Sequence, residues 1–134
     1  MSRKKPSILL VEDTPPLARA YRAYLQGEPY HVDHVETGKA AMASLERGYP
    51  DALVLDLQLP DMNGLDILKQ VHGKPGAPGV VVITANGSVN TAVEAMREGA
   101  VDFLVKPFTA ERLIYTLRNV LERQHLTRLV ETYR

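Results

Sequence analysis

The stretch Pro50–Gly64, PDALVLDLQLPDMNG, decides the fold of this 134-residue chain. Its apolar run 52–55 ends in Asp56, and the turn formers Pro60 and Gly64 follow. A short unbroken apolar run between turn signals is typical of a strand buried on both faces of a parallel sheet. Such sheets bind ligands at the carboxyl ends of their strands. Asp56 is therefore predicted to lie where chemistry is done, although an isolated aspartate at a strand end more often only stabilises a turn.

Working outward, four more segments have the composition of strands: residues 7–11, 30–35, 80–83 and 101–105. Helical patterns follow the five strands, and proline or polar residues open several of them, such as Thr37 and Thr109. Strict alternation of strands and helices indicates a parallel sheet with helices on both faces. We therefore predict an α/β, flavodoxin-like (βα)5 doubly wound fold with a five-stranded sheet in the order 2-1-3-4-5.

The composition excludes several classes of protein. Sixteen basic residues balance sixteen acidic ones, which argues against a general nucleic-acid or membrane-surface binder. The absence of cysteine excludes a disulfide scaffold, a thiol nucleophile and a cysteine metal site. The basic first residues lack the apolar core of a signal peptide, and no apolar run has membrane-spanning length. We expect a cytoplasmic protein without direct nucleic-acid or membrane contact.

The last helix is predicted to change its apolar face near Gln124. An earlier stripe, from Leu113 to Leu121, is expected to pack on the sheet, and a second stripe at the opposite azimuth comprises Leu126, Leu129, Val130 and Tyr133. The tail beyond the domain is expected to have nothing of its own to pack on. It is either a frayed end or a signalling helix that pairs with another chain or leads into a further domain. The predicted division is a globular domain, residues 1–122, and a helical extension, residues 123–134.

Four strands of the predicted sheet end in residues that carry chemistry: Glu12 and Asp13, Asp56, Thr84, and Lys106. Strands 1, 3, 4 and 5 would be neighbours, so these side chains would converge on one edge of the sheet. Each residue alone has an ordinary explanation as a cap, a turn former or a solvated charge. Together they would crowd three carboxylates beside one lysine, which is unfavourable without a further cation.

A hard divalent ion would relieve this crowding. Mg²⁺ prefers oxygen ligands in an octahedron, usually one or two carboxylates completed by waters and phosphate oxygens. Asp13 and Asp56 suit direct ligation, Glu12 suits contact through water, and the backbone carbonyl of Gln58 could add a ligand. We therefore predict a Mg²⁺ site at this edge.

The remaining coordination positions would accept a phosphoryl group. A carboxylate can attack phosphorus and form an acyl phosphate, and Asp56 is placed for this at the end of the central strand. The Lys106 ammonium and the Thr84 hydroxyl would stabilise charge on the phosphoryl oxygens. No glycine-rich phosphate loop is present, so the donor must bring its own activated phosphoryl group.

Four short motifs, in this order and spacing, resemble the receiver domain of bacterial two-component response regulators. The resemblance spans residues 7–120, and the motifs are Val11-Glu12-Asp13, the block Leu55-Asp56-Leu57 through Gly64, Ile83-Thr84-Ala85, and Asp102–Phe108. The stretch 83–100 is similar to NtrC-type regulators, which join a receiver to an AAA+ ATPase and a DNA-binding domain and act with sigma-N RNA polymerase. The segments 11–14 and 21–25 look like LuxO-type quorum-sensing members.

The resemblance assigns further roles. It implies that Asp56 is the phosphoacceptor, that Glu12, Asp13 and Asp56 form the Mg²⁺ site, and that Thr84 and Lys106 are switch residues. It implies a cis peptide before Pro107, and it places Phe103 at the aromatic switch position. Phe103 would move inward when Thr84 is drawn to the phosphoryl group, which would re-form the surface of the fourth helix, fifth strand and fifth helix.

The resemblance also implies partners. The donor would be a histidine kinase or a histidine phosphotransfer protein. The domain would be a signalling module that catalyses only its own phosphorylation and dephosphorylation. A homodimer through the fourth helix, fifth strand, fifth helix and C-terminal helix is a further expectation.

Four alternatives remain open from the sequence. A flavodoxin-like electron carrier would show a flavin chromophore. A Mg²⁺-dependent phosphatase with an aspartyl nucleophile usually has an acid two residues after it, where this chain has Gln58. A stand-alone phosphorelay receiver would lack an output domain. A degenerate receiver that only dimerises would not need the full set of acidic, hydroxyl and lysine residues.

Overall fold

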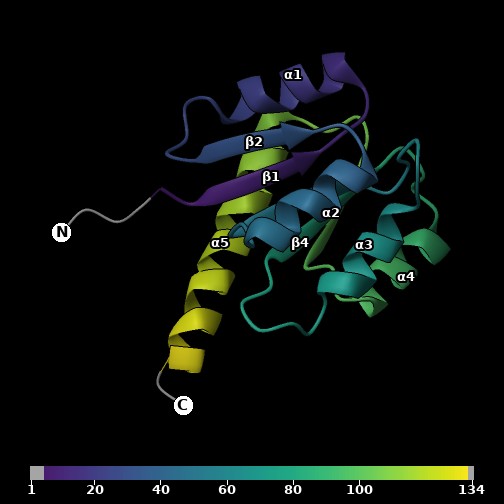
Figure 1. Cartoon of the computed structure of the whole chain (residues 1–134). Helices are drawn as coiled ribbons and strands as arrows, with labels where there is room; N and C mark the ends of the chain where they lie inside the picture. Colours follow the sequence, from purple (N-terminus) through teal and green to yellow (C-terminus); the bar gives the residue numbers. More distant parts are fainter. Residues whose placement is uncertain (1–4, 133–134) are drawn as a thin grey trace.

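The computed structural model describes residues 5–132 and contains one parallel sheet of five strands with helices on both faces (Figure 1). The strand order is β2-β1-β3-β4-β5, so the predicted fold and order are confirmed. The strands are β1 Ser7–Val11, β2 His31–Val35, β3 Ala52–Asp56, β4 Gly79–Thr84 and β5 Asp102–Val105. The helices are α1 Pro15–Leu25, α2 Gly38–Arg47, α3 Gly64–Val71, α4 Val89–Arg97 and α5 Ala110–Thr132.

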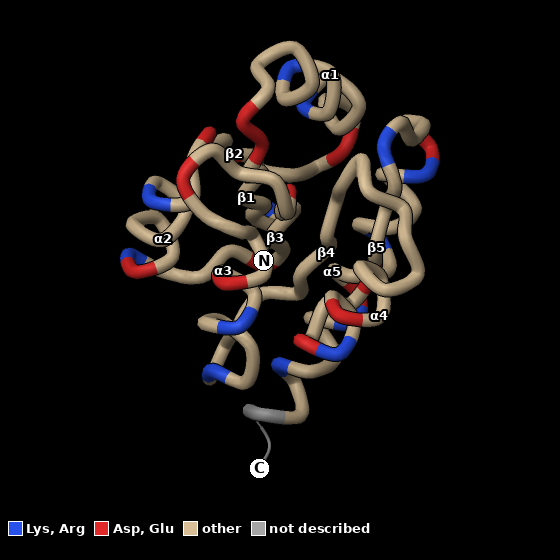
Figure 2. The backbone as a smooth tube through the Cα atoms, turned by 90° about the vertical axis from the view of Figure 1, so that its right-hand side faces the viewer, with Lys and Arg blue, Asp and Glu red and all other residues tan. Residues whose placement is uncertain are grey.

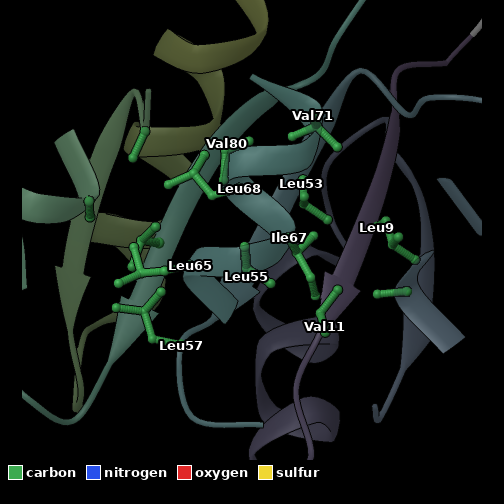
Figure 3. Packing of buried hydrophobic residues seen from close by; sticks show 14 of the residues in the cluster. Leu9, Val11, Leu53, Leu55, Leu57, Leu65, Ile67, Leu68, Val71 and Val80 are labelled. Atoms are coloured by element: carbon green, nitrogen blue, oxygen red, sulfur yellow. The ribbon is translucent and has the colours of Figure 1, made fainter. Parts of the chain in front are cut away.

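Two apolar cores fill the space between the sheet and its helices, because successive strand residues point to opposite faces. Side chains of α2, α3 and α4 pack with Leu9, Leu53 and their neighbours on one face, as Figure 3 shows for the α3 side. Side chains of α1 and α5 pack with Ile8, Val54 and their neighbours on the other face. The strands β3 and β4 are buried along their whole length, which explains their unbroken apolar sequences.

Polar side chains cap the starts of several helices. The hydroxyl oxygen of Thr37 accepts the Ala40 amide at 3.0 Å, and the hydroxyl of Thr109 accepts the Arg112 amide at 3.1 Å, as the sequence predicts. Asn63 caps α3 in the same way, through the Leu65 amide at 3.0 Å. These caps fix where the helices begin after the loops at the carboxyl edge of the sheet.

Helix α4 presents its larger apolar side chains to solvent. Val89, Val93 and Met96 are 76%, 46% and 47% exposed, whereas the small Ala95 is its buried residue. Val89, Val93 and Met96 recur at helical spacing in the sequence, and this apolar row therefore lies on the solvent side of α4.

Helix α5 is continuous from the domain into the extension and runs past the amino-terminal edge of the sheet (Figure 1). Its first stripe is buried at Leu113, Leu117 and Val120 as predicted, and Leu126 and Val130 of the second stripe are more than half exposed. Tyr133 lies outside the described residues.

The expectation that the tail has nothing to pack on is wrong. The side-chain amide of Gln124 donates to the Ala77 carbonyl, and the Arg128 guanidinium pairs with the Asp51 carboxylate. At about 100° per residue, these two positions continue the stripe of Leu117 toward the domain. The domain-facing side of α5 therefore continues past Gln124, but it changes from apolar to polar.

Charges of both signs are interspersed over the elements, without a long run of one sign (Figure 2). Among residues 5–132, no helix is long and apolar enough to cross a membrane.

Candidate functional site

The carboxyl ends of β1, β3, β4 and β5 bring the predicted site residues to one edge of the sheet. Asp56 is the last residue of β3 and lies opposite Ile83 in the β3–β4 register, so Thr84 follows directly. The Lys106 amide then donates to the Thr84 carbonyl at 2.8 Å. Parallel pairing therefore places residues far apart in the sequence beside one another.

Three carboxylates meet at this edge. Glu12, Asp13 and Asp56 each offer one oxygen, and these oxygens lie within 4.8 Å of one another. Glu12 is fully buried, Asp56 is 3% exposed, and Asp13 is half-buried. Burial of two acidic side chains next to a third is unfavourable unless positive charge compensates them.

Lys106 supplies part of that compensation. Its ammonium lies 2.5 Å from Glu12 Oε1 and 2.7 Å from Asp56 Oδ2, and its side chain is only 14% exposed. Burial alone would lower the pKa of Lys106, but the hydrogen bonds to Asp56 and Glu12 outweigh it and raise the pKa above its usual value. Lys106 is therefore charged at neutral pH and bridges β1, β3 and the end of β5.

Glu12 shows how tight the balance of charge is. Burial raises the pKa of Glu12, and the negative charge of Asp56 acts in the same direction. Hydrogen bonds from Lys106 and from the Thr14 amide, the latter at 3.1 Å, oppose this rise without cancelling it. Because the rise comes mainly from burial, Glu12 depends on Lys106 and the Thr14 amide to hold its negative charge inside the protein.

A hard divalent cation fits this donor set. The three carboxylate oxygens are the ligand type that Mg²⁺ prefers, and their crowding gives a reason for a second positive charge. The backbone amide of Gln58 donates to Asp56 Oδ1 at 2.9 Å, which orients the Asp56 carboxylate. A role for the Gln58 carbonyl as ligand stays a prediction.

Thr84 is 1% exposed, and its hydroxyl oxygen accepts a hydrogen bond from the backbone amide of Asn86 at 3.1 Å. This contact ties the hydroxyl to the loop that leads into α4. Phe103, opposite Val82 in the register, is half-buried against the core beneath α2–α4. The peptide between Lys106 and Pro107 is cis, as the resemblance implies.

The sequence does not identify Tyr21 as a neighbour of the site. Tyr21 reads as one apolar position of the first helix, but its ring stacks on Phe108 with centroids 4.8 Å apart. Burial raises its pKa to about 12, and the charges of Lys106, Glu12 and Asp56 also act on it. Helical spacing signals that Tyr21 is buried, but only the packing of α1 against the start of α5 brings it to the site.

The loop after Asp56 is held by contacts that the sequence does not reveal. The Asp61 carboxylate accepts the amides of Gly38 at 2.8 Å and Lys39 at 2.9 Å, and these bonds lower its pKa. A Cβ on Gly64 would lie 2.4 Å from the Asp56 carbonyl oxygen, so only glycine fits there. Asp61 and Gly64 therefore fix the path of the chain that leaves Asp56.

Comparison with known proteins gives a consistent result. A family profile described as "Response regulator receiver domain" matches residues 8–118. The regulatory protein LuxO of Vibrio cholerae is 46% identical over 114 residues, which is 85% of this chain and 25% of that protein. The alginate biosynthesis transcriptional regulatory protein AlgB of Pseudomonas aeruginosa is 40% identical over 130 residues, 97% of this chain and 29% of that protein.

Solved structures agree. The signal receiver domain of a LuxO repressor protein from Vibrio parahaemolyticus superimposes with a TM-score of 0.90 at 44% identity, over 95% of this chain and 98% of that one. NtrX from Brucella abortus gives a TM-score of 0.87 at 32% identity, over 97% of this chain and 30% of that one. The chain spans about a quarter of the length of the LuxO proteins that it matches.

Proposed function

This chain belongs to the response regulator receiver domain family, and from that premise we propose that it accepts a phosphoryl group on Asp56. The donor is a histidine kinase or a histidine phosphotransfer protein, and the reaction depends on Mg²⁺. The observation that carries the proposal is the buried Asp56 carboxylate, which lies 2.7 Å from the Lys106 ammonium and within 4.8 Å of two further acids.

The proposed Mg²⁺ ligands are Glu12, Asp13, Asp56 and the carbonyl of Gln58, with Glu12 acting through water. When bound there, Mg²⁺ supplies positive charge next to the phosphoryl oxygens. The three crowded carboxylates support this assignment, because one lysine ammonium does not neutralise them.

The proposed chemistry is a single phosphoryl transfer. An Asp56 carboxylate oxygen forms a bond to phosphorus, the phosphorus–nitrogen bond of the donor phosphohistidine breaks, and the electron pair stays on the imidazole nitrogen. Lys106 and Thr84 then hold the phosphoryl oxygens. Water reverses the modification by hydrolysing the acyl phosphate, so the domain acts only on itself and is a signalling module.

The signal is proposed to be a shift between two conformations. The hydrogen bond between the Thr84 hydroxyl and the backbone amide of Asn86 breaks, and the hydroxyl turns to the phosphoryl group. Phe103 then moves into the space that opens. Pro107 is proposed to belong to the same switch as Thr84 and Phe103. A shift from 1:99 to 99:1 needs about 5.5 kcal/mol of preference for one state, which a few charge-assisted contacts to phosphate can supply.

The surface that changes is proposed to be that of α4, β5 and α5. It already exposes large apolar side chains: Val89, Val93, Met96, Val105 and Tyr115. A second copy of the chain is the proposed partner, and the C-terminal part of α5 is proposed to contribute to the same interface. Sizing by light scattering with and without beryllofluoride and Mg²⁺ tests this, and an unchanged mass at all concentrations would contradict it.

We further propose that residues 1–122 form the receiver unit and that residues 123–134 lead toward a cytoplasmic AAA+ output domain. The similarity to LuxO and AlgB, of which the matched segments are 25% and 29%, supports control of sigma-N-dependent transcription, with quorum sensing as the setting.

Labelling with a small phosphodonor tests the proposed acceptor. We expect one phosphoryl group per chain, located on Asp56 by peptide mass spectrometry, and none in the Asp56→Asn variant. Asp51→Asn, at the other end of the same strand, is the matched control and should label normally. Stoichiometric labelling of Asp56→Asn at another residue would show that the acceptor is wrong.

A further inference from the structure

The amino-terminal edge of the sheet contains a second group of paired charges, remote from Asp56 along β3. Asp51 directly precedes β3, and its Oδ2 accepts the Ser7 amide at 2.7 Å and the Ser7 hydroxyl at 3.2 Å. Its Oδ1 pairs with the Arg128 guanidinium in the extension of α5. Asp51 thus connects β1, β3 and a helix segment 77 residues further along the chain.

The loop before β4 provides the rest of the contact. The Gln124 amide donates to the Ala77 carbonyl, and Arg128 also reaches the Gly76 carbonyl at 3.5 Å. A Cβ on Gly79, the first residue of β4, would lie 2.6 Å from Val120 Cγ1, so the chain approaches α5 closely where the loop ends. Gln124 and Arg128 are one helical turn apart and face the same loop.

Apolar packing does not hold this part of the helix. A hollow of about 800 Å³ lies beside the extension, between α5 and the start of β1, and Tyr30, Asp51 and Arg128 are among its lining residues. Leu126, Leu129 and Val130 lie on the opposite side of the helix and are 54%, 41% and 56% exposed. The side chains of Gln124 and Arg128 instead make polar contacts that hold this part of the helix against the domain.

We propose that Asp51, Gln124 and Arg128 form a polar clamp that fixes the C-terminal half of α5 on the amino-terminal edge of the sheet. The clamp makes the helix leave the domain in one direction, with the row of Leu126, Leu129 and Val130 facing outward. A second copy of the chain, which is the partner in the proposed function, would therefore meet that row at a defined orientation. Asp51 and Arg128 are positioning residues in this account and have no part in phosphoryl transfer.

The direction of the helix can be measured by electron-spin distance measurements. The chain has no cysteine, so Lys69→Cys on α3 and Thr127→Cys on the extension, both at exposed positions, allow two specific spin labels. We expect a narrow distance distribution in the parent chain and a clearly broader one after Arg128→Ala. Dilution with unlabelled chain removes distances between copies.

Arg123→Ala is the matched control, because Arg123 is an exposed arginine on the same helix. Alanine is the best helix former, so propensity alone would not loosen the helix in either variant. An equal width of the distance distribution in the parent, Arg128→Ala and Arg123→Ala chains would overturn the clamp.

Hydrogen exchange of amides 124–130 gives a second readout. A half-exposed ion pair predicts about two- to fivefold faster exchange in Arg128→Ala. Asp51→Asn should also speed the exchange, and the effect of the double variant should be smaller than the sum of the two single effects, because both substitutions remove the Asp51–Arg128 pair. Independent, additive effects would contradict the pairing. Labelling of Asp56 should be normal in Arg128→Ala, so the clamp and the proposed phosphoryl transfer fail separately.

Discussion

An acid lies at each end of strand β3, and each acid pairs with a cation, one just before α5 and one within it. Asp56 at the carboxyl end lies 2.7 Å from Lys106, which precedes the helix, and Asp51 before the strand pairs with Arg128 near the end of the helix. The two pairs differ in burial. The side chains of Asp56 and Lys106 are 4% and 14% exposed, whereas those of Asp51 and Arg128 are 29% and 36% exposed.

The two ion pairs also differ in the charges that surround them. Lys106 faces two buried carboxylates with a third nearby, so its edge of the sheet has an excess of negative charge. Asp51 has its hydrogen bonds from Ser7 as well as its own arginine, so its charge is compensated. A site that lacks positive charge is prepared for a cation and a ligand, whereas a compensated pair only fixes two segments together.

The largest expected difference between the two edges is in phosphoryl transfer. Lys106→Ala removes a cation from the phosphoryl oxygens, so we expect labelling of Asp56 to slow by about 100-fold, the size of one lost transition-state contact. Arg128→Ala should leave the rate unchanged. Initial rates with a small phosphodonor and saturating Mg²⁺ measure both, and similar rates for the two variants would mean that the edges are not functionally distinct.

The next largest difference is expected in the free energy of unfolding of the Lys106→Ala and Arg128→Ala variants. Lys106→Ala leaves Glu12 and Asp56 buried without their partner, so it should lower the free energy of unfolding by about 3 kcal/mol in metal-free buffer. Arg128→Ala should cost only about 0.5 kcal/mol, because its pair is partly solvated. Urea unfolding at pH 8 measures both losses. Excess Mg²⁺ should recover part of the first loss, and equal losses would contradict the account.

Gly64 and Gly79 allow the packing at the two edges of the sheet to be compared. At Gly64 an added Cβ meets the backbone oxygen of Asp56, which cannot move without displacing the site, whereas at Gly79 it meets a methyl group of Val120 that can rotate. We expect Gly64→Ala to lower the free energy of unfolding by about 2–3 kcal/mol and Gly79→Ala by about 1 kcal/mol. Thermal and urea unfolding give the comparison, and a larger loss at Gly79 would reverse it.

The smallest effect expected is a pH dependence from Glu12. Its pKa is raised in the folded state above 4.5, so the folded chain binds this proton more tightly than the unfolded chain does. Glu12 therefore lowers the free energy of unfolding as the pH rises from 4.5 through its folded-state pKa. Subtracting the profile of Glu12→Gln from that of the parent chain in EDTA isolates this slope. A flat or rising difference would show that Lys106 fully compensates the buried carboxylate.

The sequence predicts the fold and the convergence of the strand-end residues on one edge for a physical reason. Buried parallel strands require unbroken apolar runs, and their alternation with helices limits the topology to few choices. Once the order 2-1-3-4-5 is chosen, Asp56, Thr84 and Lys106 must share one edge. The residues at strand ends are therefore set by local patterns together with one topological rule.

Other features depend on side chains that meet only after folding. Apolar periodicity shows that α4 has an apolar side at Val93 and Met96, but it does not distinguish a core side from an exposed surface. The sequence does not predict the contacts of the extension, because Gln124 and Arg128 look like solvated residues and their partners Ala77 and Asp51 are distant in the sequence. Long-range polar contacts have no periodic signature.

The most direct test of the central claim is a crystal structure of the chain with Mg²⁺ and beryllofluoride, which imitates a phosphoryl group. We predict beryllium bonded to an Asp56 carboxylate oxygen, fluorides in contact with Lys106 and Thr84, and Mg²⁺ beside Glu12 and Asp13. Beryllofluoride bound to another residue, or a pocket left empty at saturating concentrations of both, would contradict the account.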